Sequence, residues 1–145
     1  MNAAIVDTSA ILALFDQDYA EHGALAKIIA TAGLVPVVSP FIVAEADHML
    51  YSRLGAEAAQ RFALDIATGA YELAEWTAED HAAALDVTRK FGRGKDYIGI
   101  ADASNVVLAD HFRTTTVLTL DQRHFRTLQP LWGAAAFRIL PCDLD

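Results

Sequence analysis

Four acidic side chains stand at positions where a carboxylate could do chemistry rather than only solvate a surface. Asp7 and Asp121 each come directly after a short, apolar, β-branched run that is typical of a buried strand. Glu45 and Asp102 each interrupt the apolar face of a predicted helix. An ionised carboxylate on a buried face is costly, so such a group must be protonated, paired with a cation or bound to a metal.

The four carboxylates would repel one another if the fold brought them together. At a separation of about 4 Å, each pair costs on the order of 1 kcal/mol in water and about 4 kcal/mol at the effective dielectric near a protein surface. No basic residue lies on the same predicted faces, so we expect a divalent cation to resolve the repulsion. A ligand set of oxygen atoms without thiolates favours Mg²⁺ or Mn²⁺.

Predicted strands alternate with predicted helices along the chain. Strands are expected at residues 3–7, 34–39, 71–76, 116–120 and 137–141, and helices at 9–15, 19–31, 40–54, 56–68, 78–91 and 97–112. The strands are continuously apolar, which is typical of a parallel sheet covered by helices on both faces. We therefore predict a three-layer α/β/α fold with a central parallel sheet of about four or five strands. Ligand sites in such sheets form at the carboxyl ends of the strands, where Asp7 and Asp121 would share one edge.

Length and composition agree with one globular domain over residues 1–145. Hydrophobic residues make up 54% of the chain and charged residues 21%, which argues against disorder. The only cysteine, Cys142, cannot form an intrachain disulfide, which favours a reducing compartment. We see neither a signal peptide nor an apolar run long enough to span a membrane. These features predict a cytoplasmic protein that has no membrane partner.

The net charge of −8 argues by itself against a polyanionic partner, but the charge is unevenly distributed. Residues 1–88 hold three basic and thirteen acidic residues, whereas residues 89–145 hold eight basic and six acidic ones. Half of those eight lie in the stretch RKFGRGK, namely Arg89, Lys90, Arg93 and Lys95. The stretch is either a solvated helix end and loop or a loop that contacts the phosphates of a nucleic acid. Arg123 and Arg126 are second candidates for phosphate contacts.

Four segments of the chain together resemble a known family. IVDTSAILALF, SPFIVAEADHML, IADASNVVLA and VLTLDQRHF are similar, in order and spacing, to the four acidic motifs of PIN-domain ribonucleases, and most of all to the VapC toxins of bacterial toxin–antitoxin pairs. The resemblance covers nearly the whole chain and implies a PIN-like fold. It also implies a set of catalytic acids that bind Mg²⁺, namely Asp7, Glu45, Asp102 and Asp121. A hydroxyl group from Ser9 or Thr119 would support them.

The resemblance further implies an activity and partners. The expected activity is that of a toxin endoribonuclease, in which a metal-activated water attacks a phosphodiester of RNA. The expected partners are a small cognate antitoxin, a tRNA or ribosomal RNA substrate, and a second copy of the chain in a homodimer. Some apolar residues of the first two predicted helices could line such interfaces, although core packing explains them more simply; they are Leu12, Leu14, Phe15, Ile28 and Ile29.

Three other functions fit parts of the sequence. An aspartyl phosphatase with Asp7 as nucleophile would need a second aspartate where Ser9 stands and a lysine late in the chain, whereas none follows Lys95. A di-iron carboxylate site would need two Glu-x-x-His pairs, and only one occurs, at residues 45–48. A metal-stabilised PIN module that binds a partner without catalysis is the third alternative. We expect His124 to orient a loop rather than to act as a base.

Overall fold

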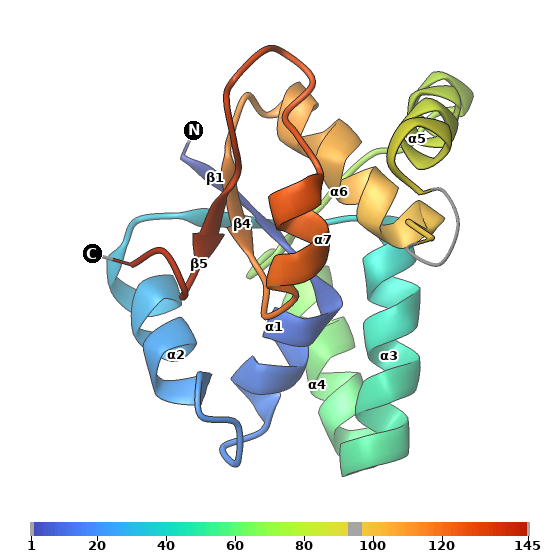
Figure 1. The fold of residues 1–145 in the computed structure, drawn as a ribbon. Coiled ribbons are helices and arrows are strands. Elements are labelled where there is room, and N and C mark those ends of the chain that lie inside the picture. The colour runs from blue at the N-terminus through green and yellow to red at the C-terminus, as the bar shows by residue number, and fades with distance from the viewer. Residues whose placement is uncertain (1, 93–96, 145) are drawn as a thin grey trace.

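A sheet of five parallel strands runs through the middle of the computed structural model, which describes residues 2–92 and 97–144 (Figure 1). The strands are β1 (Ala3–Val6), β2 (Val35–Val38), β3 (Glu72–Leu73), β4 (Thr116–Leu118) and β5 (Arg138–Leu140), and they lie in the order β3-β2-β1-β4-β5. The central strand is therefore β1, in which Ile5 pairs with Val37 of β2 and with Val117 of β4. The predicted parallel sheet is confirmed.

Alternation along the strands directs side chains into two separate cores, one on each face of the sheet. Ile5 and Val37 pack with the layer formed by α5 (Ala78–Phe91), α6 (Ile100–His111) and α7 (Gln122–Thr127). Val6 and Val38 pack with the opposite layer, formed by α1 (Thr8–Phe15), α2 (His22–Thr31), α3 (Pro40–Leu54) and α4 (Ala56–Ala67). The predicted three-layer arrangement is thus confirmed (Figure 1). Within the described ranges, no helix has both the length and the apolar character needed to cross a membrane.

Local signals in the sequence set several helix ends. Ser39 caps α3, where its side chain accepts a hydrogen bond from a backbone N–H two residues later, and Pro40 takes the first helical position. Thr77 and Asp80 form the predicted capping box at the start of α5. Gly55 separates α3 from α4 at a φ of 97°, a conformation that residues with a side chain rarely adopt.

Several predicted boundaries are wrong. Helix α2 begins at His22 rather than at residue 19. Asp16 holds the preceding segment in a turn, because its side chain accepts the backbone N–H of Asp18 at 3.0 Å. Helix α6 begins at Ile100 rather than at residue 97, and β3 spans only two residues of the predicted stretch 71–76.

The largest difference from the prediction follows β4, which ends two residues before the predicted strand does. There the backbone N–H of Leu120 donates to the hydroxyl of Ser9 at 2.9 Å, and that of Asp121 donates to the hydroxyl of Thr119 at 3.0 Å. The backbone N–H groups after β4 therefore bond to side-chain hydroxyl groups instead of to a neighbouring strand, and the chain turns there. Asp121 then caps α7, a six-residue helix that the sequence does not predict, by accepting the backbone N–H of His124.

The apolar residues considered for partner contacts pack within the molecule. Leu12 and Ile28 are buried, and Leu14, Phe15 and Ile29 are partly buried against the same core. Core packing, the simpler of the two explanations, accounts for all five.

Candidate functional site

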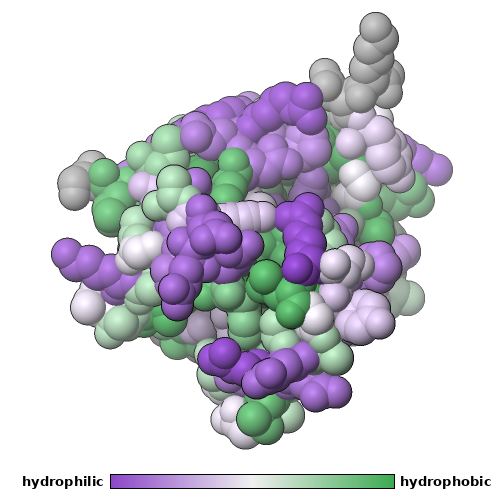
Figure 2. All heavy atoms as spheres, turned by 90° about the horizontal axis from the view of Figure 1, so that it is seen from below, coloured by the Kyte–Doolittle hydropathy of each residue, from purple (hydrophilic) through white to green (hydrophobic). Residues whose placement is uncertain are grey.

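A pocket at the carboxyl ends of the central strands is lined by all four predicted acids. Asp7 follows β1, Asp102 lies in the first turn of α6, and Asp121 begins α7. Glu45 reaches the pocket from α3, and the pocket volume is about 350 Å³. Helices α1 and α3 both run toward the lower end of the molecule in Figure 1. Figure 2 shows this end from below, and hydrophilic side chains lie across its middle with hydrophobic ones between them.

Asp7 is the most deeply buried of the four acids, at 6% exposure. Its carboxylate accepts hydrogen bonds from the hydroxyl of Thr119 at 2.8 Å and from the side-chain amide of Asn105 at 3.3 Å. Burial, and after it the nearby charge of Asp102, raises the pKa of Asp7 from an ordinary value of 3.8 to about 7. The fold therefore holds this carboxyl group where its ionised form is costly unless a cation is near.

Ser9 and Thr119 both lie near Asp7. The sequence offered either residue as the hydroxyl that supports the acids, and the structure places both of them there. Their hydroxyl oxygens lie 3.1 Å apart. Thr119 donates to Asp7 and accepts from the backbone N–H of Asp121, while Ser9 accepts from the backbone N–H of Leu120. These hydrogen bonds thus connect Asp7, which follows β1, with the turn before Asp121, which begins α7.

His124 faces two of the acids from α7. Its Nδ1 lies 2.7 Å from an oxygen of Asp102 and 3.0 Å from an oxygen of Asp121. The expectation that no basic residue shares a face with the acids is therefore wrong here, because α7 turns the imidazole toward α6. It is also wrong on α3, where Arg53 lies on the same face as Glu45 and lines the same pocket. Burial raises the pKa of Asp102, and the hydrogen bond and charge of His124 offset part of that rise.

Glu45 is exposed, although the sequence places it on the buried face of its helix. The buried stripe of α3 is narrower than its apolar stripe and consists of Ile42, Ala46 and Leu50. Glu45 lies beside this stripe, at the open side of the pocket. Its charge still helps to raise the pKa of Asp7 and that of Asp102.

Asn105 is a residue of the site that sequence reasoning missed. It is fully buried and donates to Asp7, while its own side-chain oxygen has no hydrogen-bond partner among the described residues. It follows Asp102 by three residues and therefore lies near it on the surface of α6. A polar residue at that spacing within an apolar helix is the signal that could have found it.

The donor atoms of the pocket fit a hard divalent cation. Asp102, Asp121 and His124 each offer one atom, and these three atoms lie within 4.8 Å of one another. The hydroxyl of Thr8, which also lines the pocket, is buried without a hydrogen-bond partner in the described part of the chain. Carboxylate oxygens suit Mg²⁺ and Mn²⁺, and an imidazole nitrogen is a ligand that Mn²⁺ accepts more readily than Mg²⁺ does.

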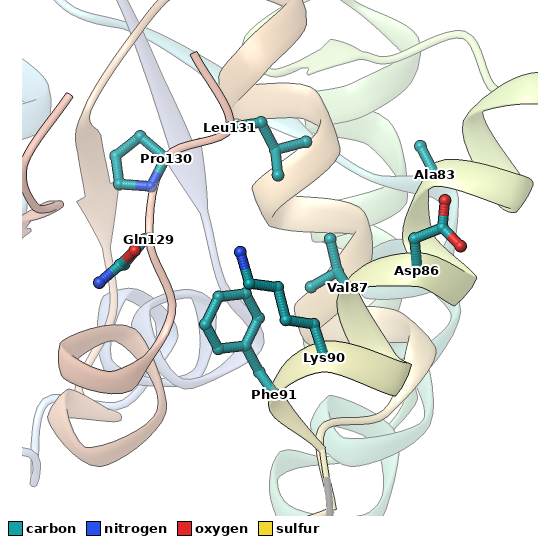
Figure 3. A pocket seen from close by; sticks show the side chains of 8 residues that line it. All are labelled: Ala83, Asp86, Val87, Lys90, Phe91, Gln129, Pro130 and Leu131. Carbon is teal, nitrogen blue, oxygen red and sulfur yellow. The ribbon is translucent and has the colours of Figure 1, made fainter. Parts of the chain in front are cut away.

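The basic stretch predicted to contact phosphates is only partly described. Arg93 and Lys95 lie outside the described residues, whereas Arg89 and Lys90 form part of the last turn of α5. The ammonium of Lys90 lies 5.2 Å from the ring centre of Phe91, in a groove between α5 and residues 129–131 (Figure 3). Neither Arg89 nor Lys90 lines the acidic pocket, and the RNA-binding role of the stretch stays a prediction.

The second pair of basic candidates lies on α7. A guanidinium nitrogen of Arg123 is 3.5 Å from Nε2 of His124, the side chain whose Nδ1 contacts two of the acids. Arg126 instead forms an ion pair with Asp143, at 2.6 and 2.9 Å. Arg123 is therefore the better placed of the two for a phosphate near the site.

Comparisons with known proteins agree with this geometry. The family model of the PIN domain matches residues 4–129. The chain is 43% identical to Ribonuclease VapC26 of Mycobacterium tuberculosis over 137 residues, which cover 94% of this chain and 99% of that protein.

Two solved structures share the fold. One is the M. tuberculosis toxin VapC20, described as cleaving the sarcin-ricin loop, with a TM-score of 0.73, 22% identity, and coverage of 83% of this chain and 92% of that one. The other is VapBC2 from Rickettsia felis bound to a promoter DNA fragment, with a TM-score of 0.68, 14% identity, and coverage of 94% and 98%.

Proposed function

This chain belongs to the PIN-domain family, and we propose that it is an endoribonuclease that depends on Mg²⁺ or Mn²⁺ and acts as the toxin of a VapBC-type toxin–antitoxin pair. The observation that carries the proposal is the convergence of four carboxylates from four separate elements on one pocket. Carboxylates kept together at a partly buried site are hard to explain by stability alone, because they repel one another.

The acids would hold the metal ion. We assign this role to Asp7, Asp102 and Asp121, with Glu45 contributing from the open side of the pocket. A divalent ion bound there would neutralise part of the charge on the scissile phosphate and lower the pKa of the attacking water. The expected products are a 5′-phosphate and a 3′-hydroxyl.

The surrounding polar residues would keep the acids in place. The hydroxyl of Thr119 and the amide of Asn105 fix the two oxygens of Asp7, at 2.8 and 3.3 Å. His124 spans Asp102 and Asp121, so one side chain orients both. Partners of this kind typically alter metal affinity or activity by about 10- to 100-fold when they are removed.

We propose partners on the same basis. The whole of residues 1–145 would act as one domain in the cytoplasm, as a homodimer, on tRNA or ribosomal RNA. The name of the ribonuclease relative supports RNA as substrate, and the VapBC2 complex supports a small antitoxin partner. Because the pocket is acidic, a basic side chain of the antitoxin could occupy it and block the site.

The test is an RNA cleavage assay with and without metal. The purified protein is incubated with tRNA and ribosomal RNA in Mg²⁺, in Mn²⁺ and in chelator, beside Asp7→Asn and Asp121→Asn. The matched control is Asp47→Asn, which removes an exposed carboxylate of α3 that does not line the pocket.

We expect wild type and the control to cleave only with metal and to leave 5′-phosphate ends, and both site variants to be inactive. Cleavage in chelator, or full activity of Asp7→Asn, would refute the proposal. Metal and RNA binding without any cleavage would favour the non-catalytic module instead.

A further inference from the structure

Arg53 is the only basic residue among the described residues that line the acidic pocket. It lies in the last turn of α3, and its guanidinium donates to the hydroxyl of Tyr19 at 2.8 Å. Tyr19 lines the same pocket. None of the ion pairs formed within residues 2–92 and 97–144 involves Arg53. A guanidinium therefore stands in a pocket of carboxylates without being neutralised by any of them.

The position of Arg53 on α3 means that the charge of the pocket wall changes along the helix. Glu45, Met49 and Arg53 follow one another at four-residue steps and so share one face of α3, and all three line the pocket. Eight helical residues rise about 12 Å along the axis. Along this wall, the carboxylate of Glu45 lies beside the other acids, the apolar side chain of Met49 comes next, and the guanidinium of Arg53 comes last.

This order of charges suits a linear polyanion. A phosphate at the acids would be held with the metal ion, and a phosphate farther along the strand would meet Arg53. A stacked nucleic-acid strand advances by about 3.4 Å per nucleotide, so about 12 Å corresponds to on the order of three nucleotides. The guanidinium has five N–H donors, of which Tyr19 takes one, and the others suit the oxygens of a phosphate.

We propose that Arg53, positioned by Tyr19, binds a backbone phosphate of single-stranded RNA a few nucleotides away from the cleaved bond. The inference rests on the proposed function, because it takes RNA as the ligand of the pocket. It assigns to the pocket a second phosphate subsite, at the end of α3 opposite the acids. It also implies that an RNA too short to reach from the acids to Arg53 gains nothing from this residue.

If Arg53 had only a structural role, the expected results would differ. The hydrogen bond between Arg53 and Tyr19 ties residues 16–21 to α3, and Tyr19 packs against the core beneath α1 and α3. If that tie were the whole role, replacing Arg53 would lower the melting temperature and would affect short and long RNAs alike. A phosphate contact affects the long RNA alone and changes the salt dependence of its binding.

The test measures the binding of fluorescein-labelled oligouridine by anisotropy, in Ca²⁺ in place of Mg²⁺ so that the RNA is not cleaved. One RNA has about twelve nucleotides and the other about two, and the salt concentration is varied between about 50 and 200 mM. The variants are Arg53→Gln, Arg53→Lys and Tyr19→Phe. Arg61→Gln is the matched control, because Arg61 is an exposed arginine of α4 that lies outside the acidic pocket. Thermal melting confirms that each variant is folded.

We expect Arg53→Gln to bind the longer RNA about five- to tenfold more weakly and to lower its log–log salt slope by about 0.7, the value for one phosphate of a single strand. The shorter RNA should bind Arg53→Gln and wild type equally. Arg53→Lys should retain most of the affinity, Tyr19→Phe should lose less than Arg53→Gln, and Arg61→Gln should match wild type. Equal losses for both RNAs, or for Arg53→Gln and Arg61→Gln, would overturn the inference.

Binding is measured here without cleavage, so the two proposals can fail separately. A wild type that cleaves RNA while Arg53→Gln binds normally would refute only the phosphate subsite. A wild type that needs Arg53 to bind the longer RNA but never cleaves RNA would refute only the ribonuclease assignment.

Discussion

Replacing Asp7 with asparagine should stabilise the metal-free protein at neutral and higher pH. The pKa of Asp7 is about 7 in the folded chain against an ordinary 3.8, so the native state binds this proton more tightly than the unfolded state does. The stability linked to that proton is fully present below about pH 3.8 and is lost as the pH rises through 7. The difference between the two pKa values corresponds to about 4 kcal/mol, at about 1.36 kcal/mol per unit. An uncharged side chain avoids this loss.

The site can accept asparagine without losing a hydrogen bond. The new amide oxygen can accept from Thr119 as the carboxylate does. The amide of Asn105 can turn by about 180°, which brings its unpartnered oxygen to the new N–H group. Most of the electrostatic gain should therefore be measurable as stability.

The assay is urea unfolding of wild type, Asp7→Asn and the Asp47→Asn control in chelator, at about pH 5 and about pH 8. The advantage of Asp7→Asn over wild type should grow by about 2.5 kcal/mol between the two pH values. Saturation with Mg²⁺ at a hundred times its dissociation constant should stabilise wild type by about 2.7 kcal/mol and the variant by less. If Asp7→Asn is less stable than wild type in chelator at pH 8, the buried carboxylate has a cationic partner, and the reasoning is refuted.

Two further outcomes follow from the same geometry, and a third follows from the charge pattern of the sequence. Asp102→Asn should stabilise the metal-free protein less than Asp7→Asn does, since it gives up the interaction with His124; equal gains in the same unfolding assay would contradict this. His124→Ala should weaken metal affinity or cleavage by about tenfold while the fold is kept, and unchanged values of both would remove its positioning role. Neutralising the basic residues of 89–95 should lower the salt slope of RNA binding by about 0.7 for each phosphate that is no longer bound, and an unchanged slope would make the stretch a solvated surface.

The position of Asp7 could be predicted from the sequence because it depends on local pattern and sheet type. A continuously apolar strand implies a parallel sheet, and a parallel sheet places its strand-end acid at the ligand edge. Glu45 was harder to place, because Phe41 and Met49 widen the apolar stripe of α3 although both are only partly buried. The sequence shows which residues are apolar, whereas the neighbouring helices decide which of them are buried.

The contacts of His124 and Asn105 could not be predicted in this way. Helix α7 has only six residues, too few for helical periodicity to be seen, and it depends on the cap at Asp121 and on the burial of Phe125. Asn105 meets Asp7 across 98 residues of chain. Such a contact depends on the packing of α6 against β1, which no local pattern specifies.

The most direct test of the catalytic metal site is a calorimetric titration of Mn²⁺ and Mg²⁺ into the chelator-treated protein at about pH 7. Wild type and Asp47→Asn should bind the ion saturably, and wild type should release about half a proton per ion, because Asp7 has a pKa of about 7. The double variant Asp7→Asn/Asp102→Asn should remain folded and bind no ion at this site. Equal binding by the double variant, or metal-dependent RNA cleavage by it, would contradict the claim that these acids form the catalytic metal site.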